Sequence, residues 1–170
     1  DRLCDKLIYR HPHVFGETVA ETAGEVCKNW ELLKMSEKDG NKSILSGVPS
    51  SMPSLIKAFR MQEKAANVGF DWDDKEGAWE KLHEEIAEVE AEMKAGNKVN
   101  CEKELGDLIF SVVNVARLNG INPDNALELT NTKFRNRFNY VEEQSKGRGK
   151  NLKEMSLAEM DELWNEAKSR

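Results

Sequence analysis

The fold is decided by the stretch AWEKLHEEIAEVEAEMKAGNKVNCEKELGDLIFSVVNVARL, residues 78–118. Its first half repeats apolar residues at intervals of three and four, which stack on one face of an α-helix: Ala78, Leu82, Ile86, Val89 and Met93. Gly96 and Asn97 end this helix, which starts near Lys75. A second helix, over about 100–118, carries apolar residues around nearly half of its circumference. We therefore expect two helices that form an antiparallel hairpin with its turn at Gly96.

The rest of the sequence is also predicted to be helical, so the expected fold class is all-α. Only four prolines occur, and no alternating run of β-branched residues of strand length lies outside the helical windows. Pro53 can open a helix to about residue 67, and Asn122-Pro123 opens a long helix to about Ser145. Ser156 and Glu159 have the spacing of a capping box before a last short helix.

Composition excludes several classes of protein. The 170 residues carry 31 acidic and 25 basic side chains, and this acidic balance makes stable nucleic-acid binding unexpected. The longest uncharged apolar stretch, residues 108–116, is far shorter than the roughly 20 residues that cross a bilayer. Cys4, Cys27 and Cys101 are an odd number with no CxxC spacing, which argues against a disulfide framework and a structural zinc site. We expect a cytoplasmic protein without a membrane segment.

Two acidic motifs lie on the two helices of the predicted hairpin. The first is EEIAE at residues 84–88, and the second is ELGD at residues 104–107. Residues three apart share a helix face, and an antiparallel hairpin turning at Gly96 places Glu88 opposite Glu104 and Glu85 opposite Asp107. All four acids then converge beside the apolar stripe, where they repel one another unless a cation joins them.

The type of ligand favours a hard cation. With oxygen ligands alone, and no His or Cys at the matching spacing, we expect Mg²⁺ before Mn²⁺ or Ca²⁺. Such sites leave coordination positions for substrate phosphates, so the pattern predicts metal-assisted phosphoryl chemistry. A di-iron carboxylate bundle would need two ExxH motifs, and only residues 80–83 fit. The remaining alternative is a non-catalytic acidic helical interaction module that binds a basic partner.

A second group of residues suits a nucleotide. Lys133 and Arg137 share one helix face, and Trp164 and Lys168 follow on the last helix. Cations suit a polyphosphate, and an indole offers a stacking surface or a hydrogen-bond donor. The alternative is a set of solvated surface cations with Trp164 in the core. The pattern K-x3-R followed by W-x3-K also occurs near the N-terminus, which suggests duplicated domains: Lys6, Arg10, Trp30 and Lys34.

Together these motifs resemble those of the MazG-type nucleoside triphosphate pyrophosphohydrolases. The resemblance rests on EExxE at 84–88, ExxD at 104–107 and the helix that carries Lys133 and Arg137. The segment RHPHVFG, residues 10–16, resembles the end of the first of two tandem MazG domains. The expected organisation is therefore the C-terminal tail of a truncated first MazG domain over 1–38, a Ser/Pro/Gly-rich linker over 39–52 and a complete second MazG domain over 53–170.

The resemblance implies a dimeric all-α helical bundle and Mg²⁺-dependent hydrolysis of NTPs and dNTPs to the monophosphate and pyrophosphate, a house-cleaning or nucleotide-pool function. It implies that the metal-binding, catalytic acids are Glu85, Glu88, Glu104 and Asp107. It also implies nucleotide contacts by Lys133, Arg137, Trp164 and Lys168. The role of Glu84 stays open. The N-terminal tail lacks the two acidic motifs, so the expected catalytic part is 53–170. A homodimer is expected because two helices cannot bury the broad apolar face alone.

Overall fold

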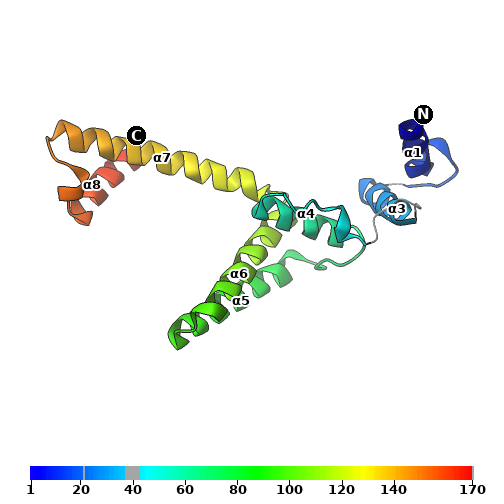
Figure 1. The fold of residues 1–170 in the computed structure, drawn as a ribbon, viewed down its shortest axis with the longest axis horizontal. Coiled ribbons are helices and arrows are strands. Elements are labelled where there is room, and N and C mark those ends of the chain that lie inside the picture. The colour runs from blue at the N-terminus through cyan, green and yellow to red at the C-terminus, as the bar shows by residue number, and fades with distance from the viewer. Residues whose placement is uncertain (21, 37–42, 170) are drawn as a thin grey trace. The chain divides into compact units, whose positions relative to one another are not determined.

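Helices make up the regular structure of this computed structural model, which describes residues 1–20, 22–36 and 43–169. Their order is shown in Figure 1: α1 (Arg2–Arg10), α2 (Pro12–Phe15), α3 (Ala23–Ser36), η1 (Leu45–Gly47), α4 (Ser54–Ala66), α5 (Lys75–Ala95), α6 (Lys98–Leu118), α7 (Pro123–Gly147), η2 (Leu152–Glu154) and α8 (Leu157–Lys168). No strand occurs in these described ranges, and the all-α prediction is confirmed. Residues 37–42, which include the start of the predicted linker, lie outside them.

The chain divides into two compact units, Asp1–Pro123 and Asp124–Arg170. In the first unit, α5 and α6 pack side by side along their lengths (Figure 1). Gly96 ends α5 with a φ of 69°, a left-handed conformation that glycine adopts without steric cost. The Asn97 side chain then caps α6 by accepting a hydrogen bond from the Asn100 backbone N–H at 3.3 Å. The expected turn and helix bounds agree with the structure to within about two residues.

Only part of the apolar stripe of the hairpin is buried by other residues of the chain. Ala78, Leu82 and Val115 form a buried cluster, and Leu108 and Leu118 pack against it. Helix α4 packs on α6 from outside the hairpin. Other members of the predicted stripe remain in contact with solvent in this chain: Ile86, Met93, Ile109 and Val112. A single copy of these helices therefore leaves a broad apolar face open.

The second unit has its own core, between α7 and the C-terminal segment. Val141, Met155 and Leu163 are buried together, and Leu163 is 0% exposed. Ser156 and Glu159 form the predicted capping box at the start of α8, with Glu159 Oε2 accepting from the Ser156 backbone N–H at 2.9 Å. The Lys150 ammonium lies 2.5 Å from Glu159 Oε1, which ties the segment after α7 to α8.

No helix in the described part of the chain is long and apolar enough to cross a membrane.

Glu159 provides a test of the second unit by pH. Hydrogen bonds from Lys150, and then from Ser156, lower the pKa of Glu159 from 4.5 to about 2. Its pKa is lower in the folded than in the unfolded state, so its stabilising effect is present above about pH 4.5 and is lost as pH falls toward 2. Glu159→Gln keeps the cap but removes the charge. We expect this variant to be less stable than wild type in urea at pH 6, with the difference vanishing near pH 2.

Because Lys150 and Glu159 are partly exposed, added salt should shrink the difference at pH 6. Equal urea midpoints for wild type and Glu159→Gln at pH 6 and low salt would contradict this account.

Candidate functional site

Three of the four predicted acids meet at the seam between α5 and α6. Carboxylate oxygens of Glu85, Glu88 and Glu104 lie within 4.8 Å of one another. Glu85 and Glu88 are one turn apart on α5, and Glu104 comes from the first half of α6. Asp107 lies outside this group, but it lines the same cavity as Glu85. The hairpin register thus brings together acids that are 16 to 19 residues apart in the sequence.

Glu85 is the most buried member of the group, with 4% of its surface exposed. Its Oε1 atom pairs with the Lys81 ammonium at 2.8 Å, and Lys81 also contacts Glu84 Oε1 at 2.8 Å. Its Oε2 atom is buried and has no hydrogen-bond partner among the described residues. A buried carboxylate oxygen without a partner is costly, so the site fits a further cation that shares Glu85 with Glu88 and Glu104.

The directions of two pKa shifts agree with an excess of negative charge at the seam. The pKa of Glu88 is raised by desolvation first and then by the charges of Glu85 and Glu104. The pKa of Lys81 is raised by its hydrogen bonds to Glu84 and Glu85. A raised pKa means that Glu88 is harder to ionise beside the other acids and that Lys81 holds its proton more strongly. Positive charge is therefore favoured at the seam. The donor set consists of carboxylate oxygens alone, which suits a hard divalent ion such as Mg²⁺.

A cavity of about 680 Å³ is lined in part by Glu85 and Asp107. Its walls come mainly from α4, the segment 69–72, α5 and α6, and Lys81, Glu85 and Asp107 are among its polar residues. The rest is largely apolar, with Met61, Phe70, Trp72 and Phe110 among its residues. A cavity of this size and character is typical of a small-molecule site.

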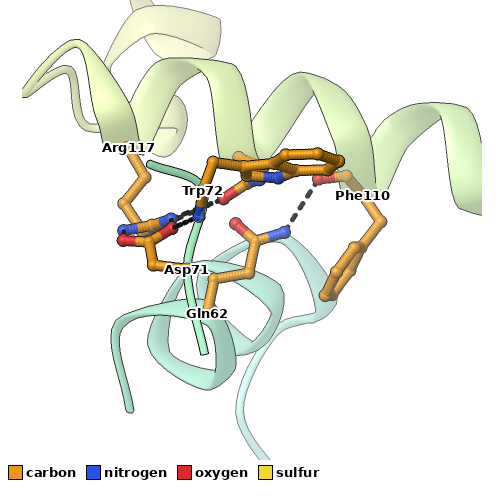
Figure 2. Close-up of polar contacts among 6 residues, drawn as sticks. Gln62, Asp71, Trp72, Phe110 and Arg117 are labelled. Carbon is orange, nitrogen blue, oxygen red and sulfur yellow. Dashed lines mark hydrogen bonds and ion pairs between the residues drawn. The ribbon is translucent and has the colours of Figure 1, made fainter. Parts of the chain in front are cut away.

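Several of its polar residues were not predicted from the sequence. Arg117 on α6 pairs through both terminal nitrogens with the Asp71 carboxylate, Nη1 donating to Oδ2 at 3.0 Å, and its Nε donates to Asn114 Oδ1 at 3.1 Å (Figure 2). Gln62 on α4 donates from Nε2 to the Phe110 carbonyl at 2.9 Å. The sequence feature that could have indicated this part of the cavity is the segment Gly69–Asp73, which interrupts the helical pattern and carries two aromatic side chains.

The predicted nucleotide contacts lie in the second unit. Arg137 on α7 lies over the ring of Trp164 on α8, with Cζ 5.7 Å from the ring centroid. Trp164 is half-buried and packs against the cluster of Val141, Met155 and Leu163. It therefore has both a core role and a cationic neighbour. Lys133 is exposed, and Lys168, also exposed, donates to Asn165 Oδ1 at 2.9 Å.

The first copy of the K-x3-R and W-x3-K pattern has a similar geometry. Helices α1 and α3 pack together, and Arg10 Cζ lies 5.4 Å from the ring centroid of Trp30. Lys34 Nζ lies 4.7 Å from the same centroid. In both copies an arginine from one helix lies over a tryptophan from another. The internal duplication stays a prediction.

Comparisons with known proteins agree with the acidic motifs. Residues 74–142 match the MazG nucleotide pyrophosphohydrolase domain. The chain is 39% identical over 170 residues to a nucleoside triphosphate pyrophosphohydrolase of Escherichia coli K12, covering 98% of this chain and 65% of the relative. It is 41% identical over 167 residues to a nucleoside triphosphate pyrophosphohydrolase/pyrophosphatase MazG of Thermotoga maritima, covering 98% of this chain and 63% of the relative.

A third relative, the uncharacterized protein YabN of Bacillus subtilis, is 46% identical over 168 residues, which are 98% of this chain and 34% of that protein. The chain thus spans slightly less than two thirds of the E. coli and T. maritima proteins. The matched segment 74–142 includes all four predicted acids together with Lys133 and Arg137, and it confirms the resemblance to the MazG family over this part of the chain.

Proposed function

We propose that the chain hydrolyses nucleoside triphosphates, both NTPs and dNTPs, to the monophosphate and pyrophosphate with Mg²⁺ as cofactor. The observation that carries this proposal is the cluster of Glu85, Glu88 and Glu104, with its buried and unpartnered oxygen, beside a cavity of about 680 Å³. The names of the E. coli and T. maritima relatives support the same reaction. The same oxygen ligands would also bind Mn²⁺.

In this proposal Glu85, Glu88 and Glu104 hold the ion, and Asp107 supplies a further carboxylate at the edge of the cavity. When bound, Mg²⁺ supplies charge neutralisation at the phosphates and lowers the pKa of a water molecule. Glu84 is paired with Lys81, whereas Glu88 makes no ion pair among the described residues. A carboxylate oxygen that the ion leaves free, on Glu84 or Glu88, would orient the attacking water and take its proton.

Lys133, Arg137 and Lys168 are proposed to neutralise the negative charge that develops on the phosphates. Trp164 offers its ring to the nucleotide beside Arg137. We also propose a homodimer, because Leu105, Ile109 and Val112 on α6 are exposed in a single chain. The three free cysteines support a cytoplasmic location, and the net charge of −6 disfavours nucleic acid as a stable partner.

The direct test is product identification by phosphorus NMR with a panel of NTPs and dNTPs, in Mg²⁺ and in chelator. We expect monophosphate and pyrophosphate to appear in Mg²⁺ alone. Intact triphosphates from a folded, dimeric sample would contradict the proposal and favour a non-catalytic acidic interaction module.

Loss of one clustered charge should abolish metal-dependent turnover. We expect Glu88→Gln and Glu104→Gln each to lower kcat by about 100-fold or more, because each removes a carboxylate from the ion and its substrate phosphates. Mg²⁺ should also raise the melting temperature of wild type but not of these variants. The matched control is Glu90→Gln, since Glu90 is exposed on α5 and pairs only with Lys94 among the described residues. Turnover and melting that match wild type in Glu88→Gln would remove Glu88 from the metal site.

The role of the cation on α7 is tested by two arginines two residues apart. Arg137→Ala should raise KM for a triphosphate by about tenfold or more, since it removes a charge-assisted contact. Arg135→Ala should leave KM unchanged, because Arg135 is exposed and contacts Thr132 on its own helix. Steady-state kinetics on both variants checks this. Equal effects of the two substitutions would indicate a general electrostatic contribution without a site at Arg137.

A further inference from the structure

Lys81 is the basic side chain that contacts the acids of the cavity. Among the described residues that line the cavity, Lys81 and Arg117 are the basic ones. Arg117 is engaged by the carboxylate of Asp71. The Lys81 ammonium, in contrast, lies 2.8 Å from Glu84 Oε1 and 2.8 Å from Glu85 Oε1. Lys81 is therefore the cation of the cavity whose position depends on the charge at the seam.

The two oxygens of the buried Glu85 carboxylate have different surroundings. Oε1 pairs with Lys81, while Oε2 is buried and has no hydrogen-bond partner among the described residues. An ion held by Glu85, Glu88 and Glu104 would share this one carboxylate with the ammonium. Two cations on the same buried carboxylate repel each other strongly, because the local dielectric constant is low. The ion and Lys81 therefore compete for Glu85.

Lys81 is able to leave Glu85 without losing every partner. Its side chain is 37% exposed, and a flexible four-carbon stem carries the ammonium. Its second partner, Glu84, has a side chain that is 57% exposed, so this pair lies at the solvent-facing side of α5. Exposed ion pairs of this kind are weak and adapt to small movements. The ammonium can therefore stay with Glu84 and with water while Glu85 turns to another cation.

We propose that Lys81 is a built-in competitor of the divalent ion: it neutralises Glu85 in the metal-free protein and gives this carboxylate up when the ion binds. The inference rests on the proposed function, because the ion is the cofactor proposed there. Its consequence is a low affinity for the metal alone, since binding must displace an ammonium as well as dehydrate the ion. The metal-free seam is in turn stabilised, because its most buried acid has a counter-charge.

The first test is a calorimetric titration with Mg²⁺ alone. Lys81→Met keeps the length of the side chain and removes the charge, so we expect it to bind Mg²⁺ about tenfold more tightly than wild type or better. Lys81→Arg keeps the charge and should stay near wild type. The matched control is Lys94→Met, since Lys94 is exposed on the same helix and pairs with Glu90 one turn earlier; its Mg²⁺ affinity should not change. Equal Mg²⁺ affinities of wild type and Lys81→Met would overturn the proposal.

Melting temperatures separate competition from a purely structural role of Lys81. In chelator, Lys81→Met should melt below wild type, because the buried Glu85 carboxylate loses its counter-charge. Saturating Mg²⁺ should then raise the melting temperature of the variant more than that of wild type, since the ion restores the missing charge without displacing an ammonium. A lysine that only braces α5 would lower the melting temperature by the same amount in chelator and in Mg²⁺, and this result would contradict the proposal.

Wild type itself provides a test that does not depend on any variant folding. Acetylation of individual lysines, followed by mass spectrometry, should become several-fold faster at Lys81 when Mg²⁺ is added, because the ammonium leaves Glu85. Lys94 in the same sample should react at the same rate with and without Mg²⁺. An unchanged rate at Lys81 once Mg²⁺ is bound would overturn the inference.

These measurements need no triphosphate, so they separate this inference from the proposed reaction. Mg²⁺ binding that ignores Lys81 would contradict the inference and leave the proposed reaction intact. Absence of Mg²⁺ binding in both wild type and Lys81→Met would contradict the inference together with the proposed cofactor. Tight binding in Lys81→Met alone would support the inference even if no triphosphate were hydrolysed.

Discussion

The register between α5 and α6 is the constraint on which the candidate site depends. It is established at Gly96, where a left-handed residue ends α5, and at Asn97, whose side chain starts α6. Each residue added to a helix rotates the following side chains by about 100°, so one inserted residue at this turn would carry Glu104 away from Glu85 and Glu88. The turn therefore determines whether the three carboxylates meet at all, and the helices around it preserve that arrangement through the cluster of Ala78, Leu82 and Val115.

Packing also explains why the acids are half-buried. The buried members of the two apolar stripes, Ala78, Leu82 and Val115, pack between the helices. The acids follow along the flank, where Glu85 is buried and Glu88 is exposed. Burial strengthens the electrostatic attraction between a carboxylate and a nearby cation because the local dielectric constant is low. An exposed Glu88 keeps the opposite side of the cluster open to water and to a substrate. The same seam thus provides a strong ligand and access to it.

The residues that could be predicted are those governed by local periodicity. The helix bounds, the capping box of Ser156 and Glu159 and the convergence of acids across the hairpin all follow from spacing within one or two adjacent helices. Gln62 and Arg117 could not be found in this way. Their partners Phe110 and Asp71 are 48 and 46 residues away, and nothing in a local pattern says that α4 and the segment after it pack on this part of α6. Such contacts depend on tertiary packing, which periodicity does not encode.

A charge count at the seam indicates what a bound triphosphate would still require. Three clustered carboxylates with the single ammonium of Lys81 leave two negative charges, and Lys81 is shared with Glu84. One divalent ion balances those two charges and leaves nothing to offset a triphosphate, which brings several more. Further positive charge would then come from other basic side chains. The proposed function assigns that charge to Lys133, Arg137 and Lys168, and Arg137 lies beside the ring of Trp164. On this argument the hairpin alone would bind a metal but would hold a nucleotide weakly.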